Sequence, residues 1–319
     1  MGHDQHTVAI FAPVVSLTVT IESREENGSA EIHFHPGGQG FWIARMLRHL
    51  GQRPLLCGPI GGETGKVIRG LLPQWGIDLS PVETDLPSPT IIQDRRSGDR
   101  ELVAESRPFS LDRHSADEFY GRFLEHAISA GLAVIAGQIG EILQLEFYRR
   151  LAHDLKSTDV KVVGDLHGSE LMSFLEGGSL DILKVSEEDL KADGLLEGDD
   201  HRSGLEALQR LTKAGSTNVV LSRGERSVLA AIDGKTFEAV PPILEAADFR
   251  GAGDSMTAGL ATSLKTGLGP EETLKLACGA GAANVTRHGL GSASRTLFQR
   301  LADQVEVTAI PSTPIYDST

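Results

Sequence analysis

The sequence predicts an α/β fold with a mostly parallel central sheet, helices on both of its faces and a small second sheet. From about residue 131, short apolar and often β-branched runs alternate with amphipathic segments. This alternation is typical of βαβ units whose parallel strands are buried on both faces. The first third of the chain instead contains runs that resemble antiparallel strands. A length of 319 residues allows one large domain or two smaller ones.

Hydrophobic periodicity assigns the individual elements. The expected buried strands are 132–136, 160–164, 181–185, 218–222 and 227–232. The expected helices among them are 112–130, 141–157, 203–215, 270–286 and 294–306. The small sheet would contain 14–23, 30–35, 90–95 and 101–105. A further helix at 41–50 has apolar Ile43, Leu47 and Leu50 on one face, and Gly51 supplies its stop.

Composition excludes several classes of protein. The formal net charge of -14 argues against nucleic acid as a partner, because such binders gather Lys and Arg on one face. Cys57 and Cys278 are too few for a disulfide framework or a cysteine-rich metal site. The polar start is unlike a signal peptide, and no apolar stretch approaches the ~20 residues of a membrane span. We therefore expect a cytoplasmic protein with free thiols and no membrane partner.

The segment 248–256 is the most informative for chemistry, because Gly251, Ala252 and Gly253 open a helix. The first amides of a helix have no partner within it and lie at the positive end of its dipole, so they can hold phosphate oxygens. Asp254 at the same helix start would repel phosphate unless it had a role, and it is a candidate base for an attacking hydroxyl. The alternative is that Asp254 is a simple N-cap residue.

Residues 251–254 look like the GAGD signature of the ribokinase, or PfkB, family of carbohydrate kinases. Residues 36–45 resemble the first signature of that family, and 61–65 resemble a sequence of its 1-phosphofructokinase and tagatose-6-phosphate kinase branch. The resemblance covers nearly the whole chain. It implies a single ribokinase-like domain over 1–319, with a three-layer core and a small β-sheet lid formed by about 13–36 and 88–107. It also implies ATP, Mg²⁺ and in-line transfer to a hydroxyl of a small-molecule carbohydrate.

The resemblance also implies nucleotide and metal residues. Ser222 and Gly224 would lie beside the nucleotide phosphates, while Gly279, Ala282 and Asn284 would face the adenine. The stretch 184–189 looks like the KPNxxE element of the family, whose acidic residue helps to organise Mg²⁺ and phosphate. Asp189 and Glu188 are therefore candidates for the metal network, although a solvated helix start explains both equally well.

The acceptor side departs from the branch that it resembles. Ser16 replaces an aspartate, Gln39 a lysine, Trp42 an asparagine, Pro89 an arginine and Gln138 a serine. The expected acceptor-side residues are Ser16, Gly38, Gln39, Gly40, Trp42 and Gln138. We infer a sugar, sugar phosphate or polyol acceptor other than fructose 1-phosphate or tagatose 6-phosphate.

A phosphate clamp from the lid remains open, since guanidinium groups match phosphate geometry. Its candidates are Arg95, Arg96 and Arg107, for which simple exposure is the alternative.

Two other functions stay open. The altered pocket and Phe249, where threonine or serine is usual, would suit a non-catalytic ligand-binding or regulatory relative. A nucleoside kinase would have Trp42 stacked on a base. The histidines show no convincing metal-ligand spacing, so none is assigned a catalytic role. The resemblance also suggests a homodimer through the lid.

Overall fold

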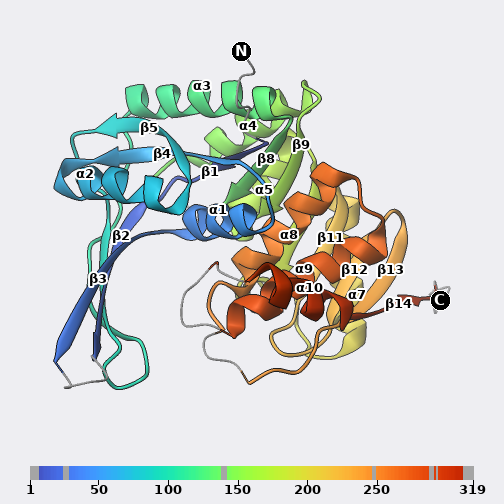
Figure 1. Ribbon diagram of the computed structural model, residues 1–319. Coiled ribbons are helices and arrows are strands. Elements are labelled where there is room, and N and C mark those ends of the chain that lie inside the picture. Colours follow the sequence, from blue (N-terminus) through green and yellow to red (C-terminus); the bar gives the residue numbers. More distant parts are fainter. Residues whose placement is uncertain are drawn as a thin grey trace, which may run out of the picture.

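The computed structural model describes residues 7–23, 29–137, 142–245, 249–286, 291 and 294–311. These residues form a ten-stranded sheet, helices on both of its faces and a separate four-stranded sheet (Figure 1). The expected α/β fold with a second, smaller sheet is therefore confirmed. No helix in the described part of the chain combines the length and the apolarity needed to cross a membrane.

The large sheet has the strand order β14-β13-β12-β11-β10-β9-β8-β1-β4-β5. Every neighbouring pair from β11 to β5 is parallel, whereas β12, β13 and β14 extend the sheet with antiparallel pairs. The strands are β1 Val8–Phe11, β4 Pro54–Gly61, β5 Asp78–Thr84, β8 Leu132–Ala136, β9 Lys161–Asp165, β10 Leu180–Ser186, β11 Ser216–Ser222, β12 Val228–Ile232, β13 Lys235–Val240 and β14 Glu306–Ile310.

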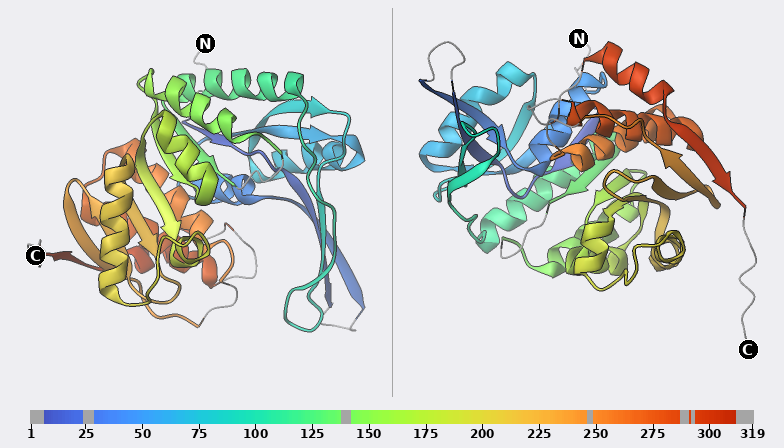
Figure 2. Two further views of the ribbon diagram at one scale, coloured as in Figure 1. Left: turned by 180° about the vertical axis from the view of Figure 1, so that it is seen from behind. Right: turned by 90° about the horizontal axis from the view of Figure 1, so that it is seen from below.

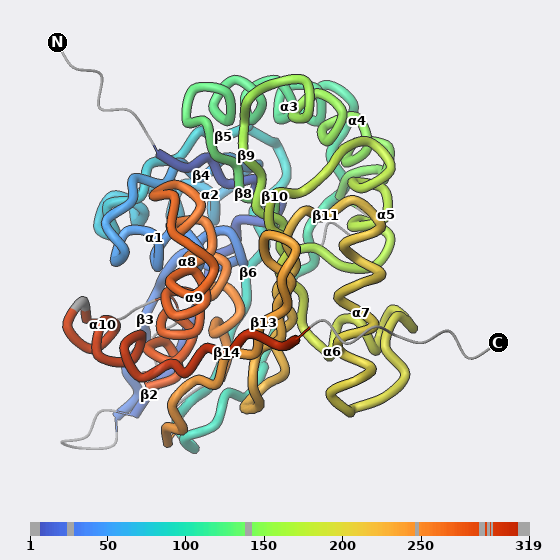
Figure 3. Tube along the Cα trace, turned by 90° about the vertical axis from the view of Figure 1, so that its right-hand side faces the viewer, coloured from blue at the N-terminus to red at the C-terminus, as the bar shows by residue number. Residues whose placement is uncertain are grey.

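Helices cover the two faces of this sheet as two separate groups (Figure 3). The first group is α1 Gln39–His49, α2 Gly62–Leu71, α8 Ala252–Thr266, α9 Pro270–Val285 and α10 Arg295–Asp303. The second group is α3 Arg113–Ala130, α4 Leu145–Lys156, α5 Gly168–Gly177 and α7 His201–Ala214. Two short helices, the 3₁₀ turn Leu72–Trp75 and α6 Glu187–Ala192, complete the set.

The alternation of side chains along a strand explains the two cores. In β1, Val8 and Ile10 belong to the core under α1 and α8, while Ala9 and Phe11 belong to the core under α3. Successive residues of a strand point to opposite faces, so a strand covered on both faces is apolar throughout. The largely apolar runs found in the sequence are the consequence.

The small sheet has the order β3-β2-β6-β7 and projects away from the large one (Figure 2). Its strands are β2 Ser16–Ser23, β3 Ala30–Gly37, β6 Thr90–Asp94 and β7 Glu101–Glu105. The outer pairs are antiparallel, as expected, but the central β2–β6 pair is parallel. The long chain segment between β3 and β6, which enters the large sheet, allows β6 to return in the same direction as β2.

Most expected strands and helices are present, but the sequence missed several. β4 and β5 contain Pro59 and Pro81, and proline and glycine weaken a strand pattern. The expected helix 294–306 ends at Asp303, and β14 starts at Glu306 and pairs with β13. Cys57 and Cys278 are buried and free, as expected, and burial raises the pKa of each thiol to about 12.

We predict that Phe11→Ala destabilises the fold by about 3–5 kcal/mol, the usual cost of truncating a buried aromatic ring. Phe11 is fully buried and stacks on Phe119 with ring centroids 4.6 Å apart, while the ring centroid of Phe123 lies at 5.2 Å. Urea unfolding measures the change. The control is Ile128→Ala on α3, the helix that carries Phe119 and Phe123, where the exposed side chain should change stability by less than about 0.5 kcal/mol. Equal losses in the two variants would contradict the prediction.

Candidate active site

The glycine-rich segment lies at the start of α8, as the sequence predicts. Gly251 is the N-cap residue with φ of 72°, a left-handed conformation that glycine adopts without strain. No side chain caps this helix end, and Asp254 lies in the first turn instead of at the N-cap. The first-turn amides have no acceptor within the helix, and the helix dipole is positive at this end. The segment therefore has the geometry of an anion site that does not need Asp254 as its cap.

A buried ion pair lies beside this helix start. Lys184 on β10 and Asp165 at the end of β9 are register partners, and Nζ of the lysine is 3.2 Å from Oδ1 of the aspartate. Thr257 of α8 donates its hydroxyl to the other oxygen, Oδ2, at 2.7 Å. Asp165 is 8% and Lys184 6% exposed. Because buried charges are tolerated only when paired and hydrogen-bonded, this trio fixes α8 against the carboxyl edge of the sheet.

Gly253 allows Lys184 to reach the helix start. A Cβ atom on Gly253 would lie 2.7 Å from Nζ of Lys184, closer than van der Waals contact allows. Asp165 holds that ammonium group in place, so it could not move away freely. The second glycine of the motif is therefore required for the approach of a cation.

The electrostatics set the protonation of Asp254. Burial and the negative charge of Asp165 raise the pKa of Asp254 to about 7, against the opposing effects of Lys184 and of a hydrogen bond from Gln39. Burial disfavours the charge of Lys184, but Asp165, Asp254 and Asp189 outweigh it and raise the lysine pKa. A carboxylate whose pKa lies near neutrality can accept a proton at physiological pH and is therefore suited to general-base chemistry.

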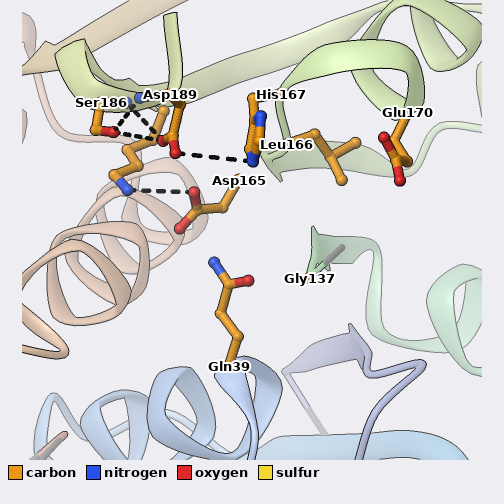
Figure 4. Close-up of a pocket in the computed structure, with 9 residues that line it drawn as sticks. Gln39, Gly137, Asp165, Leu166, His167, Glu170, Ser186 and Asp189 are labelled. Atoms are coloured by element: carbon orange, nitrogen blue, oxygen red, sulfur yellow. Dashed lines mark hydrogen bonds and ion pairs between the residues drawn. The ribbon is translucent and has the colours of Figure 1, made fainter. Parts of the chain in front are cut away.

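A cavity of about 450 Å³ opens beside this cluster (Figure 4). It lies where β8, β9 and β10 end, and the carboxyl ends of parallel strands are where open α/β sheets bind ligands. Its lining residues are Gln39, Gly137, Asp165, Leu166, His167, Glu170, Lys184, Ser186 and Asp189. The side chain of Gln39 points into the cavity from the start of α1 (Figure 4).

Of the two candidate metal ligands, only one lies at the cavity. Asp189 lines the cavity, whereas Glu188 is exposed and is not among the lining residues. Asp189 forms a capping box with Ser186 at the start of α6: its amide donates to the Ser186 hydroxyl, and its Oδ2 accepts from the Ser186 amide at 3.2 Å. Capping of α6 thus accounts for the contacts of Oδ2 of Asp189. The other oxygen, Oδ1, lies 3.7 Å from Nε2 of His167.

The acceptor-side residues are only partly brought together. Gln39 reaches the cavity, whereas Ser16 is buried in β2, and Trp42 packs edge-on against Phe41 and His35. The two glycines of this segment serve close packing: a Cβ on Gly38 would lie 2.4 Å from the Val14 carbonyl oxygen, and one on Gly40 would lie 2.7 Å from the Cβ of Ala12. Gln138 lies outside the described residues.

The nucleotide-side candidates fall into two groups. Ser222 ends β11, one strand beyond Lys184, and Gly224 follows with φ of 63°, so both lie at the same sheet edge as the cavity. Gly279 instead meets α10, since a Cβ there would lie 2.7 Å from that of Ala302. Ala282 is buried on α9.

Asn284 supports the start of α8. It donates its side-chain amide to the Arg250 carbonyl at 2.7 Å, one residue before the N-cap residue Gly251, and accepts from the Gly291 amide at 2.6 Å. Asn284 thereby ties the end of α9 to the segment that leads into α8.

Sequence reasoning gave no role to Asp165, Lys184 or His167, although all three line the cavity. One signal for Asp165 was present: it directly follows the expected strand 160–164 of a parallel sheet, and polar residues at that end of a strand face the ligand crevice. No local pattern could show that Lys184 pairs with it, because the partners are 19 residues apart and meet only in the sheet register.

Comparison with known proteins agrees with this geometry. A model of the pfkB family carbohydrate kinases matches residues 10–297. The ATP-dependent 6-phosphofructokinase isozyme 2 of Escherichia coli (strain K12) is 26% identical over 276 residues, covering 84% of this chain and 87% of that protein. The 1-phosphofructokinase of Bacillus subtilis (strain 168) is 25% identical over 284 residues, covering 86% and 89% of the two chains.

A solved structure shows the same fold. The phosphofructokinase-2 from Escherichia coli in complex with potassium superposes with a TM-score of 0.83 at 22% identity, covering 94% of this chain and 98% of that one. The expected ribokinase-like arrangement is thereby confirmed. Together the family match, the sheet topology and the cluster at the start of α8 define a sugar kinase, and the chain belongs to the pfkB family of carbohydrate kinases.

A base role for Asp254 predicts that kcat/KM rises with pH through about 7, because a carboxyl group whose pKa is about 7 can accept a proton only when it is ionised. Lys184→Met removes a positive charge that lowers this pKa, so the rise should move to higher pH. Initial rates between pH 5.5 and 9 measure the midpoint. Lys213→Met, at the exposed end of α7, is the control and should keep the wild-type midpoint. An unchanged or lower midpoint in Lys184→Met would show that Asp254 does not govern this limb.

Proposed function

We propose that this protein transfers the γ-phosphoryl group of ATP to a hydroxyl of a sugar, sugar phosphate or related polyol. The observation that carries the proposal is Asp254, a carboxyl group with a pKa of about 7 in the first turn of α8, beside Lys184 and the amides of 251–253. These are the parts that phosphoryl transfer requires: a base, a cation and an anion cradle.

The proposed step follows from the position of these groups. Asp254 takes the proton of the acceptor hydroxyl as its oxygen bonds to the γ-phosphorus, and the bond from that phosphorus to the leaving oxygen of ADP breaks. The amides of Gly251, Ala252 and Gly253 stabilise the negative charge that develops on the transferring group, and Lys184 adds a positive charge nearby.

The described residues fit a divalent cation carried by the nucleotide. They contain no group of three or more ligating side chains that could hold a metal by themselves. Mg²⁺ is usually bound through one or two carboxylates together with substrate phosphates, and Asp189 supplies such a carboxylate in the cavity. A bound Mg²⁺ would neutralise phosphate charge during transfer.

On the acceptor side, the proposed contact with the sugar comes from the uncharged amide group of Gln39. Its side chain enters the cavity and hydrogen-bonds to Asp254. The names of the related phosphofructokinases favour a sugar phosphate as the acceptor. Its sugar would be held at Gln39, and any phosphate would lie farther from the base. Trp42 packs against Phe41 and His35 and is absent from the cavity lining, so a nucleoside acceptor has no support.

We also propose that the small sheet acts as a lid on a single domain spanning 1–319. β3 ends at Gly37, two residues before Gln39 starts α1, so a movement of the sheet would move Gln39 in the cavity. Large apolar side chains are exposed on both edge strands: Phe34 is 54% and Leu102 61% exposed, and Ile32 and Val103 lie beside them. Exposed apolar edge strands favour pairing with a second copy.

We predict that Asp254→Asn lowers turnover by about 10²–10⁴-fold, the usual contribution of a general base. The assay is ATP consumption with a panel of free and phosphorylated ketoses, aldoses and polyols. Failure of every acceptor with the wild type would refute the kinase proposal, and turnover within threefold of wild type in the variant would remove Asp254 from the base role.

The same substitution should leave the protein folded. The folded-state pKa of Asp254 is raised from 3.8 to about 7, so the stability contributed by the neutral carboxyl group is complete below pH 3.8 and is lost as the pH rises from 3.8 to about 7. Asn carries no charge, so thermal unfolding should show a larger gain in stability at pH 8 than at pH 5. A loss of stability at pH 8 would mean that lost activity cannot be assigned to chemistry.

We predict that Phe34→Glu converts a dimer to a monomer in light scattering, because it places a charge on the exposed face of β3. Val67→Glu, also at an exposed apolar side chain but on α2, is the control and should remain dimeric. A wild-type monomer, or a dimer in both variants, would exclude the lid as the interface.

A further inference from the structure

His167 lies in the cavity with a fixed orientation. It is the N-cap residue of α5 and follows Asp165 by two residues. Its Nδ1 is 3.2 and 3.3 Å from the two carboxylate oxygens of Asp193, and Oδ2 of Asp193 also accepts from the Gly168 amide at 2.7 Å. Asp193 therefore holds both the ring and the chain that carries it. A carboxylate on Nδ1 favours the tautomer that carries its proton on Nδ1 and its lone pair on Nε2.

The Nε2 atom faces the carboxylate of Asp189 (Figure 4). It lies 3.7 Å from Oδ1, while Oδ2 of Asp189 is held by the amide and hydroxyl of Ser186. Asp193 thus holds Nδ1 of His167 and Ser186 holds Oδ2 of Asp189, while Nε2 and Oδ1 face each other at the cavity wall. The donors come from different strand ends, since His167 follows β9 and Asp189 follows β10.

The separation suits two ligands of one metal ion. Ligands at about 2.1 Å from a cation are about 3.0 Å apart at a right angle and about 3.4 Å apart at a tetrahedral angle. The 3.7 Å between Nε2 and Oδ1 needs only a small rotation of one side chain to reach these values. A histidine that gives one nitrogen to a carboxylate and the other to a metal is the common arrangement in metal sites.

The charge around the pair also favours a cation. Asp165, Glu170 and Asp189 line the cavity, and Lys184 is paired with Asp165. A polyphosphate entering this cavity would meet net negative charge at the His167 end, where a divalent cation lowers the repulsion.

We propose that Nε2 of His167 and Oδ1 of Asp189 are two ligands of one divalent-cation site, which polyphosphate oxygens and water complete, and that Asp193 positions the imidazole. The polyphosphate in this site rests on the proposed function. Because imidazole is a softer ligand than carboxylate, the site should favour Co²⁺ over Mg²⁺ more strongly than an all-oxygen site does.

The test is pulsed electron paramagnetic resonance of Mn²⁺ bound to the full-length protein with tripolyphosphate, which contains no nitrogen. Wild type should show the modulation of a directly bound imidazole nitrogen, and His167→Ser should lose it. Serine is a preferred N-cap residue, so this variant should keep α5. Asp193→Asn retains an acceptor for Nδ1 and for the Gly168 amide, so it should keep the signal but bind Mn²⁺ about tenfold more weakly.

The matched control is His153→Ser. His153 is exposed on α4 and also lies beside a carboxylate, with Nδ1 3.2 Å from Oδ1 of Asp154, and its loss should leave the nitrogen signal unchanged. The proposal is wrong if Mn²⁺ does not bind, if wild type shows no bound nitrogen, or if the signal survives in His167→Ser. The nitrogen signal is measured without turnover, so the metal-site test can succeed even if the kinase proposal fails. An active wild type without the nitrogen signal would refute His167 as a ligand and would leave the kinase proposal standing.

Discussion

The buried pair of Lys184 and Asp165 is the interaction on which the site depends. Two charges removed from water are tolerated only with close, complete pairing, and here Thr257 of α8 satisfies the second carboxylate oxygen. The pair therefore joins β9, β10 and α8 at a single point. Removing either charge would leave the other one uncompensated, which usually costs more than the pair contributes. The position of the start of α8 relative to the sheet follows from this constraint.

The same pair sets the chemistry of Asp254. The negative charge of Asp165 and burial raise the pKa of Asp254, while Lys184 opposes them, and the balance lies near neutrality. A group with an unperturbed pKa of 3.8 would be a weaker base at physiological pH. Asp165, Glu170 and Asp189 also line the cavity, and these three carboxylates place negative charge where the proposed polyphosphate would enter.

Elements that depend on local patterns could be predicted from the sequence, whereas elements that depend on pairing between distant segments could not. The largely buried strands β8, β9 and β11 and the amphipathic helices α3, α4 and α7 were expected within a few residues, because hydrophobic periodicity is local. β13 and β14 were missed, because their pairing is decided between segments far apart in the chain. At the site, the glycine-rich helix start at 251–254 was predicted, whereas Ser16 and Trp42 were expected beside the acceptor and are absent from the cavity lining.

The sequence by itself determined the class of fold and the glycine-rich start of α8, because such a helix start is defined by adjacent residues. Only the tertiary structure decided which charges act together. Lys184 and Asp165 are 19 residues apart, and Thr257 joins Asp165 across 92 residues. Electrostatic interactions depend on distance and burial, and neither quantity can be read from the order of residues along the chain. The protonation of Asp254 and the orientation of His167 are therefore properties of the folded protein.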